Sequence, residues 1–200
     1  RDDLVTGVQT CALPISAFKY KVRKQWVDVT CPWGNQIRCH GPATFEGLKL
    51  GIPYIEFDVP AKTAKGIARF YQQVLGAPAS ASGKAGEAIC EVQAGPYQVL
   101  RFKETRKDLP DYDGHHIAIY IVNFSDAHRY LKQQRLITEE SDAHQYRFQQ
   151  IVDPNNGDKL FEIEHEVRSL HHPMYNRHLV NRNPAQRFMG YQRGQDAMNP

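Results

Sequence analysis

Polar and apolar residues alternate in two segments of this chain, as they do in a β-strand with one buried face. The segments are 54–59 and 116–121, and their first residues lie 62 positions apart. After the first segment, apolar residues recur at helical spacing: Ile67, Phe70, Tyr71, Val74 and Leu75. After the second, Ser125 suits a helix N-cap, and the apolar face of the helix consists of Ala127, Tyr130 and Leu131. The pattern predicts two strand–helix openings of the same kind.

Each opening is followed by strand-like segments separated by turn residues. In the first unit, segments 87–94 and 97–103 flank Gly95-Pro96. In the second, segments 146–152 and 159–166 flank the turn residues 153–157. The sequence therefore predicts two tandem βαβββ modules, at 51–104 and 113–166, within a domain at 50–166.

An earlier part of the chain repeats only the end of such a module. Strand-like segments 26–30 and 36–39 flank turn residues, with no helix pattern before them. We interpret residues 17–45 as the C-terminal part of a truncated module. Residues 5–15 resemble a translated sequencing adapter, so residues 1–16 are set aside as an artefact rather than native sequence.

Composition and charge exclude several classes of protein. The 200 residues are 41% hydrophobic and 24% charged, as in ordinary globular proteins. No apolar run approaches the roughly 18 residues of a membrane-spanning helix, and the net charge of +3 is dispersed, so we expect neither a membrane nor a nucleic-acid partner. Cys11, Cys31, Cys39 and Cys90 form no CxxC pair, which is typical of thiols in a reducing compartment, and we expect a cytoplasmic protein.

Tandem βαβββ units resemble the vicinal oxygen chelate superfamily, which includes glyoxalase I, bleomycin-resistance proteins and type I extradiol dioxygenases. The resemblance covers about 51–166. It rests on three motifs in register: the opening 54–76, the strand start Gly114-His115-His116-Ile117-Ala118, and the close Asp153-Pro154…Gly157…Phe161-Glu162-Ile163. It implies an α+β fold in which the paired modules form a cupped mixed sheet. The active site lies inside that cup.

In the family, four inward positions hold a metal, and here they map to Tyr54, Arg101, His116 and Glu162. His116 and Glu162 suit a divalent metal such as Fe, Mn, Ni or Zn. Arg101 departs from the pattern, because a guanidinium repels a cation. Strand parity places Glu56 in the cup beside Tyr54, and either residue is a candidate for moving protons.

The same parity provides a candidate ligand wall. Tyr97 and Tyr120 face the cup, and together with Arg101 they are the expected substrate-binding residues. The guanidinium of Arg101 suits a carboxylate, which is either the substrate's or an internal one from Glu162 or Glu56.

The resemblance leaves three interpretations open. The first is a glyoxalase- or dioxygenase-type enzyme that acts on a small oxygenated substrate through a metal. The second is a metal-free binding protein, as the bleomycin-resistance members are. The third is the degenerate half of a four-module protein. We expect a small-molecule ligand in each case, with a homodimer open. Residues 167–200 have low periodicity and are predicted as an extended tail.

Overall fold

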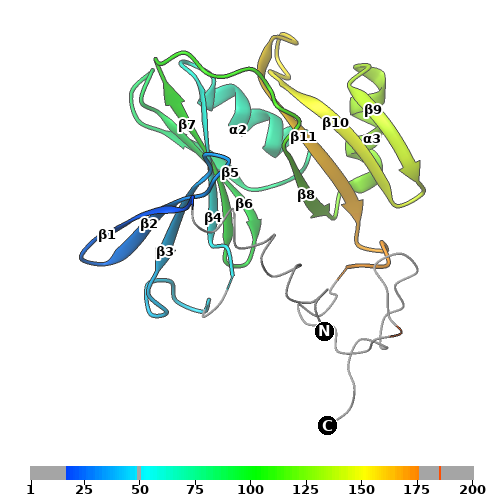
Figure 1. The fold of residues 1–200 in the computed structure, drawn as a ribbon. Helices are drawn as coiled ribbons and strands as arrows, with labels where there is room; N and C mark the ends of the chain where they lie inside the picture. The colour runs from blue at the N-terminus through cyan, green and yellow to red at the C-terminus, as the bar shows by residue number, and fades with distance from the viewer. Residues whose placement is uncertain (1–16, 49–50, 176–184, 186–200) are drawn as a thin grey trace. The chain divides into compact units, whose positions relative to one another are not determined.

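The structure is a computed structural model that describes residues 17–48, 51–175 and 185. It divides into two compact units, 1–53 and 54–200 (Figure 1). The expected artefact at 1–16 and most of the tail beyond 175 lie outside the described residues.

The first unit contains an antiparallel sheet of three strands, β1 (Lys19–Val22), β2 (Trp26–Thr30) and β3 (Gln36–His40), in the order β1-β2-β3. Strands β2 and β3 occupy the predicted segments, whereas β1 was not predicted. Asp28 accepts hydrogen bonds from Arg38 Nε at 2.9 Å and from Arg23 Nε at 3.0 Å. The Arg38 bond, aided by Arg23 and opposed by desolvation, lowers the pKa of Asp28 to about 2. The connectivity repeats the last three strands of a βαβββ module.

The second unit begins with the first complete module. It consists of β4 (Tyr54–Pro60), α2 (Ala64–Gln73), β5 (Ala79–Ser82), β6 (Ile89–Gly95) and β7 (Gln98–Thr105). The sheet order is β4-β7-β6-β5, with β4 parallel to β7. The short strand β5 has the sequence ASAS, whose small residues give no apolar signal, and its position was not predicted.

The second module has the same connectivity. It consists of β8 (His116–Ile121), α3 (Phe124–Gln133), β9 (Ile137–Asp142), β10 (Gln145–Val152) and β11 (Lys159–Ser169), in the order β8-β11-β10-β9. The predicted α+β class with paired βαβββ modules is confirmed. Strand β11 continues past the predicted start of the tail at 167, since Val167 and Ser169 are buried and Ser169 pairs with Ile121 of β8.

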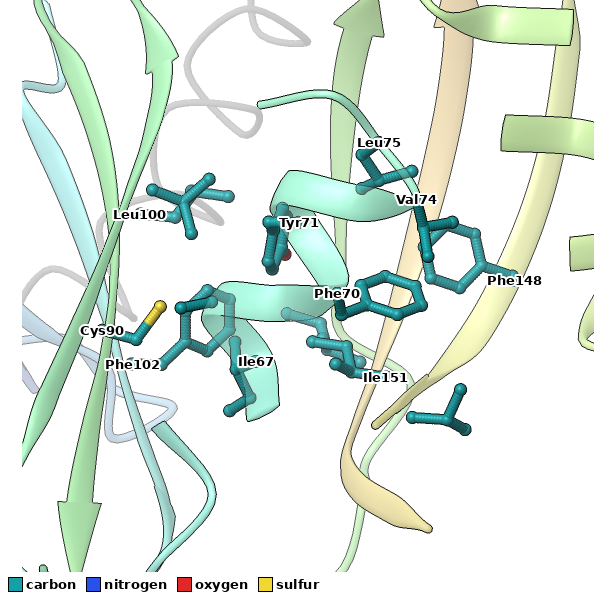
Figure 2. Close-up of a cluster of buried hydrophobic side chains, with 14 of the residues drawn as sticks. Ile67, Phe70, Tyr71, Val74, Leu75, Cys90, Leu100, Phe102, Phe148 and Ile151 are labelled. Atoms are coloured by element: carbon teal, nitrogen blue, oxygen red, sulfur yellow. The ribbon is translucent and has the colours of Figure 1, made fainter. Parts of the chain in front are cut away.

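The hydrophobic core of the second unit surrounds α2. Figure 2 shows α2 with Cys90, Leu100 and Phe102 of the first sheet on one side and Phe148 and Ile151 of the second on the other. Ring centroids of Tyr71 and Phe102 lie 5.5 Å apart, and those of Phe70 and Phe148 lie 5.7 Å apart. The apolar faces of both sheets therefore cover the same helix, as alternation along their strands predicted.

A buried carboxylate from β7 holds the N-terminus of α2. Thr63 precedes the helix, but its hydroxyl donates to the carbonyl of Pro60 instead of capping it. Glu104, which is 4% exposed, accepts a hydrogen bond from the Ala64 amide at 3.0 Å and another from the Gly86 amide. Burial favours a higher pKa for Glu104, but the backbone amides of Lys62, Ala64, Gly86 and Ala88 outweigh it and lower that pKa.

Two side-chain contacts join the modules through α2. Arg69 forms an ion pair and a hydrogen bond with Asp153, which precedes the turn between β10 and β11. Tyr71 Oη lies 2.6 Å from Nε2 of the fully buried His165 on β11. Because Nδ1 of His165 faces the Ile163 carbonyl at 2.9 Å and must donate to it, Nε2 accepts from the tyrosine hydroxyl. Both ends of this buried imidazole are satisfied.

Candidate functional site

The β4-β7-β6-β5 sheet, called the first sheet of the second unit, carries predicted site residues on its polar side. We call its outward side chains Tyr54, Glu56, Glu91, Arg101 and Lys103 the first polar face. Glu56 of β4, Arg101 of β7 and Glu91 of β6 are direct neighbours across three adjacent strands. The row therefore alternates carboxylate, guanidinium and carboxylate.

Arg101 is oriented by its neighbours on this face. Its Nε donates to Glu91 Oε1 at 2.8 Å, and its Cζ lies 4.7 Å from the ring centroid of Tyr54. The expected carboxylate partners were Glu162 or Glu56; the observed partner is Glu91, which sequence reasoning missed. Glu56 instead approaches Lys103 Nζ at 3.9 Å. Within the described residues, the two Nη groups of Arg101 make no hydrogen bond, and the side chain is 35% exposed.

Tyr97 lies in the turn between β6 and β7 and is 54% exposed. Its position two residues before Val99 places it at the end of the first polar face. Its phenol is therefore accessible from solvent, as a ligand-binding role requires.

The polar side of the second sheet is occupied by an internal charge network. We call its side chains His116, Tyr120, Arg147, Glu164, Glu166 and Arg168 the second polar face. Arg147 donates to Glu164 at 2.7 Å and to Glu166 at 2.6 Å. Arg168 also pairs with Glu166, which is only 5% exposed. Charges buried to this degree require such partners, and the two arginines neutralise the carboxylates of Glu164 and Glu166.

Tyr120 belongs to this network. Its hydroxyl accepts a hydrogen bond from Arg168 Nη1 at 3.0 Å, and its ring lies 5.3 Å from Tyr175 and 6.1 Å from His172. The segment after β11 therefore contacts the predicted ligand-binding residue. Burial, followed by the charge of Arg168, lowers the pKa of His172.

The predicted metal pair, His116 and Glu162, is not a cross-strand pair. His116 lies opposite Glu164, whereas Tyr54 lies opposite Val99. Val99 of β7 and Glu164 of β11 therefore occupy equivalent positions in the two modules, and they are 65 residues apart in the sequence. The sequence pattern had instead aligned Arg101 with Glu162, which are 61 residues apart. The turn between β10 and β11 is longer than the turn between β6 and β7. Glu162 pairs with Lys159 Nζ at 2.6 Å.

The four expected inward positions do not converge within one chain. Tyr54 and Arg101 lie on the first polar face, while His116 and Glu162 lie on the outer side of the second sheet. Figure 2 shows α2 between apolar side chains of both sheets, and the polar faces are the opposite sides of those two sheets. The space between the sheets is therefore filled by the helix.

The side chains in the described residues do not form a divalent metal site within one chain. No group of three or more His, Cys, Asp or Glu suited to a metal occurs in the described part of the molecule. The carboxylates nearest His116 are already held by Arg147 and Lys159, and Arg101 occupies a position where the family has a ligand. We therefore derive no chemical step through a metal.

The chain was compared with known families, curated proteins and solved structures. No protein-family model and no curated protein matches the sequence. Solved structures similar to it include a possible glyoxalase from Bacillus cereus, with a TM-score of 0.42, 15% identity and coverage of 60% of this chain and 98% of that chain. Others are a lactoylglutathione lyase from Agrobacterium tumefaciens (0.38, 13%, 62% and 96%) and a glyoxylase/bleomycin resistance protein/dioxygenase domain from Frankia sp. (0.37, 16%, 64% and 98%).

The tandem modules, each with its first strand parallel to its last, define a vicinal oxygen chelate fold. This assignment rests on the element order and strand pairing, and it concerns the fold alone. No helix in the described residues is long and apolar enough to span a membrane.

Proposed function

We propose that this chain is a small-molecule-binding protein with a vicinal oxygen chelate fold, and that Arg101 binds an anionic group of an oxygenated ligand. The observation that carries the proposal is the orientation of Arg101. Glu91 holds its Nε and Tyr54 lies beneath its plane, so the unbonded Nη groups are preorganised. A guanidinium fixed in this way suits a carboxylate.

The surroundings of Arg101 favour a ligand with an aromatic or polar body. Tyr54 places a phenol against the guanidinium, Tyr97 adds an exposed phenol at the end of the same face, and Lys103 adds a second cation. The negative charges of Glu91 and Glu56 weaken the electrostatic attraction of this face for an anion. We therefore expect hydrogen-bond geometry to contribute more to ligand affinity than net charge does. The proposed ligand class is small oxygenated carboxylates.

We further propose that a second copy of the chain completes the cup. The two polar faces lie on opposite outer sides of the second unit, so one chain cannot enclose a ligand between them. A homodimer that apposes the first polar face of one copy to the second polar face of the other forms two equivalent cups. Sedimentation of the purified protein tests this step, and a monomer at every concentration contradicts it.

Titration with 3,4-dihydroxybenzoate and catechol tests the ligand class. The two probes share vicinal hydroxyls, but only the first has a carboxylate. We expect calorimetry to give roughly tenfold tighter binding of 3,4-dihydroxybenzoate, since a charge-assisted hydrogen bond contributes about 1.5 kcal/mol or more. Arg101→Met should abolish this preference, and Arg101→Lys should restore only part of it. Equal binding of both probes by the parent contradicts the proposal.

A metal-dependent enzyme is the second candidate function. His116 is exposed and lies opposite Glu164, so a second copy that brings Tyr54 and Glu56 to this face adds oxygen ligands and a proton carrier. Glu162, two residues earlier on the same side of β11, is a further ligand candidate. Elemental analysis for Fe, Mn, Ni and Zn distinguishes the candidates: stoichiometric metal that is lost in His116→Ala favours the enzyme.

We propose a cytoplasmic location. Cys31, Cys39 and Cys90, the cysteines in the described residues, are free thiols, and two of them are buried. Burial, followed by the charge of Glu91, raises the pKa of Cys90 to about 12, so this thiol is unreactive. Free thiols are typical of a reducing compartment.

A further inference from the structure

A cavity of about 320 Å³ lies on the apolar side of the β4-β7-β6-β5 sheet, and Tyr120 of the second polar face is among its lining residues. Its walls are the C-terminal end of α2, strands β6 and β7, and the end of β8 with the residues after it. Leu75, Leu100 and Ile121 are among its lining residues. Both modules thus contribute walls, and the volume is near the lower end of the range for small-molecule sites.

The cavity is distinct from the site around Arg101. Leu100 lines the cavity and is the chain neighbour of Arg101, and successive side chains of a strand point to opposite faces. A ligand in the cavity is therefore separated from the first polar face by the sheet itself.

The cavity has a neutral lining. None of its lining residues is Asp, Glu, Lys, Arg or His. Tyr71 contributes to the wall, but its hydroxyl is already donated to His165. Gln93 and Asn123 provide neutral polar groups, and Ala94 and Val122 are exposed lining residues through which the cavity meets solvent.

We propose that this cavity binds a small, neutral and mostly apolar molecule the size of a fused bicyclic ring. Its volume is too small to hold a peptide helix. The absence of charge among its lining residues disfavours the carboxylates proposed for Arg101, because a buried anion without a partner is costly. The amides of Gln93 and Asn123 suit a single hydroxyl or similar polar tip.

The test uses 2-naphthol, which combines an apolar bicycle with one hydroxyl. We expect calorimetry of the full chain to detect saturable binding in the micromolar range. Ala94→Phe, which places a ring in the exposed part of the lining, should weaken it roughly tenfold or more. Ala118→Phe is the matched control: it makes the same change at an exposed alanine of β8, on the opposite face from Ile119 and Ile121. This control should leave binding unchanged.

Two further results decide the outcome. If Ala94→Phe fails to fold by circular dichroism, Ala77→Leu fills the cavity from the end of α2 and takes its place. If Ala118→Phe weakens binding while the cavity-filling variant does not, 2-naphthol binds a polar face and the proposal is wrong. Absence of saturable binding by the parent also overturns it. Neither result bears on the carboxylate preference of Arg101, which has its own probe pair.

Discussion

Replacing His165 by Gln should remove much of the acid sensitivity of the second unit. His165 is fully buried between Tyr71 and Phe148, whose ring stacks on it at 4.3 Å. Desolvation, opposed by the bond to the Ile163 carbonyl, lowers the pKa of His165 from 6.5 to about 4. The folded chain therefore keeps this imidazole neutral, while the unfolded chain takes up a proton below pH 6.5.

The sign and size of the effect follow from linkage. Between pH 6.5 and about pH 4 the unfolded state binds more protons, so the free energy of unfolding falls as the pH falls. A pKa difference of this size corresponds to a loss of about 3 kcal/mol. Glutamine retains an oxygen that accepts from Tyr71 Oη but cannot titrate. His165→Gln should lose this part of the pH dependence, whatever its stability at neutral pH.

Urea unfolding at about pH 7 and about pH 4.5 measures the difference. Far-ultraviolet circular dichroism is the proper signal, because α2 and α3 lie in the second unit, whereas Trp26 and Trp33, the two tryptophans, lie in the first. His128→Gln, which alters a histidine near the surface, is the control and should retain the contribution of His165. The reasoning is refuted if His165→Gln and the parent lose the same free energy between the two pH values.

Three further predictions address the remaining charged contacts. Glu104→Gln should lower the free energy of unfolding by about 1–3 kcal/mol at neutral pH, since an amide cannot accept both the Ala64 and Gly86 hydrogen bonds equally. Because the pKa of Glu104 is lowered by folding, this difference should shrink as the pH falls below the carboxylate's ordinary range, and exposed Glu87→Gln should show neither effect. Arg69→Met should lower the free energy of unfolding by about 1–2 kcal/mol, because it breaks the ion pair with the largely buried Asp153. Arg129→Met, which breaks an exposed ion pair with Asp126, should lower it by less than about 0.5 kcal/mol, and equal losses in urea unfolding would contradict a stabilising role for the Arg69 pair. Arg101→Glu should create affinity for Mn²⁺ by calorimetry, because the new carboxylate lies between Glu56 and Glu91, and equal binding by the parent contradicts this.

The sequence predicted the modules because their signals are local. Alternation in β4 and β8 and the helical spacing in α2 and α3 identify the elements and the face that each buries. Leu100, Phe102, Ile117 and Ile163 are buried as parity indicated, although Ile55 near the start of β4 is 38% exposed. The edge strands β5 and β9 were not located, since ASAS and ITEESD lack an apolar face.

The candidate site depended on long-range features that parity does not determine. Parity says which side of a strand is polar, but not that α2 lies between both sheets and separates Arg101 from His116. The partner of Arg101 can be identified only when the register of β6 against β7 is known, because that register places Glu91 beside Arg101. Likewise, the register of β11 against β8 places Glu164, rather than Glu162, opposite His116.

A crystal structure of the protein with bound 3,4-dihydroxybenzoate would show which groups bind the ligand. We expect the carboxylate to lie on the Nη atoms of Arg101, with the aromatic ring near Tyr54 and Nε still bonded to Glu91. Opposite this ligand, the second polar face of another copy should close the cup. A ligand held instead through its vicinal oxygens by a metal on His116 would contradict the account.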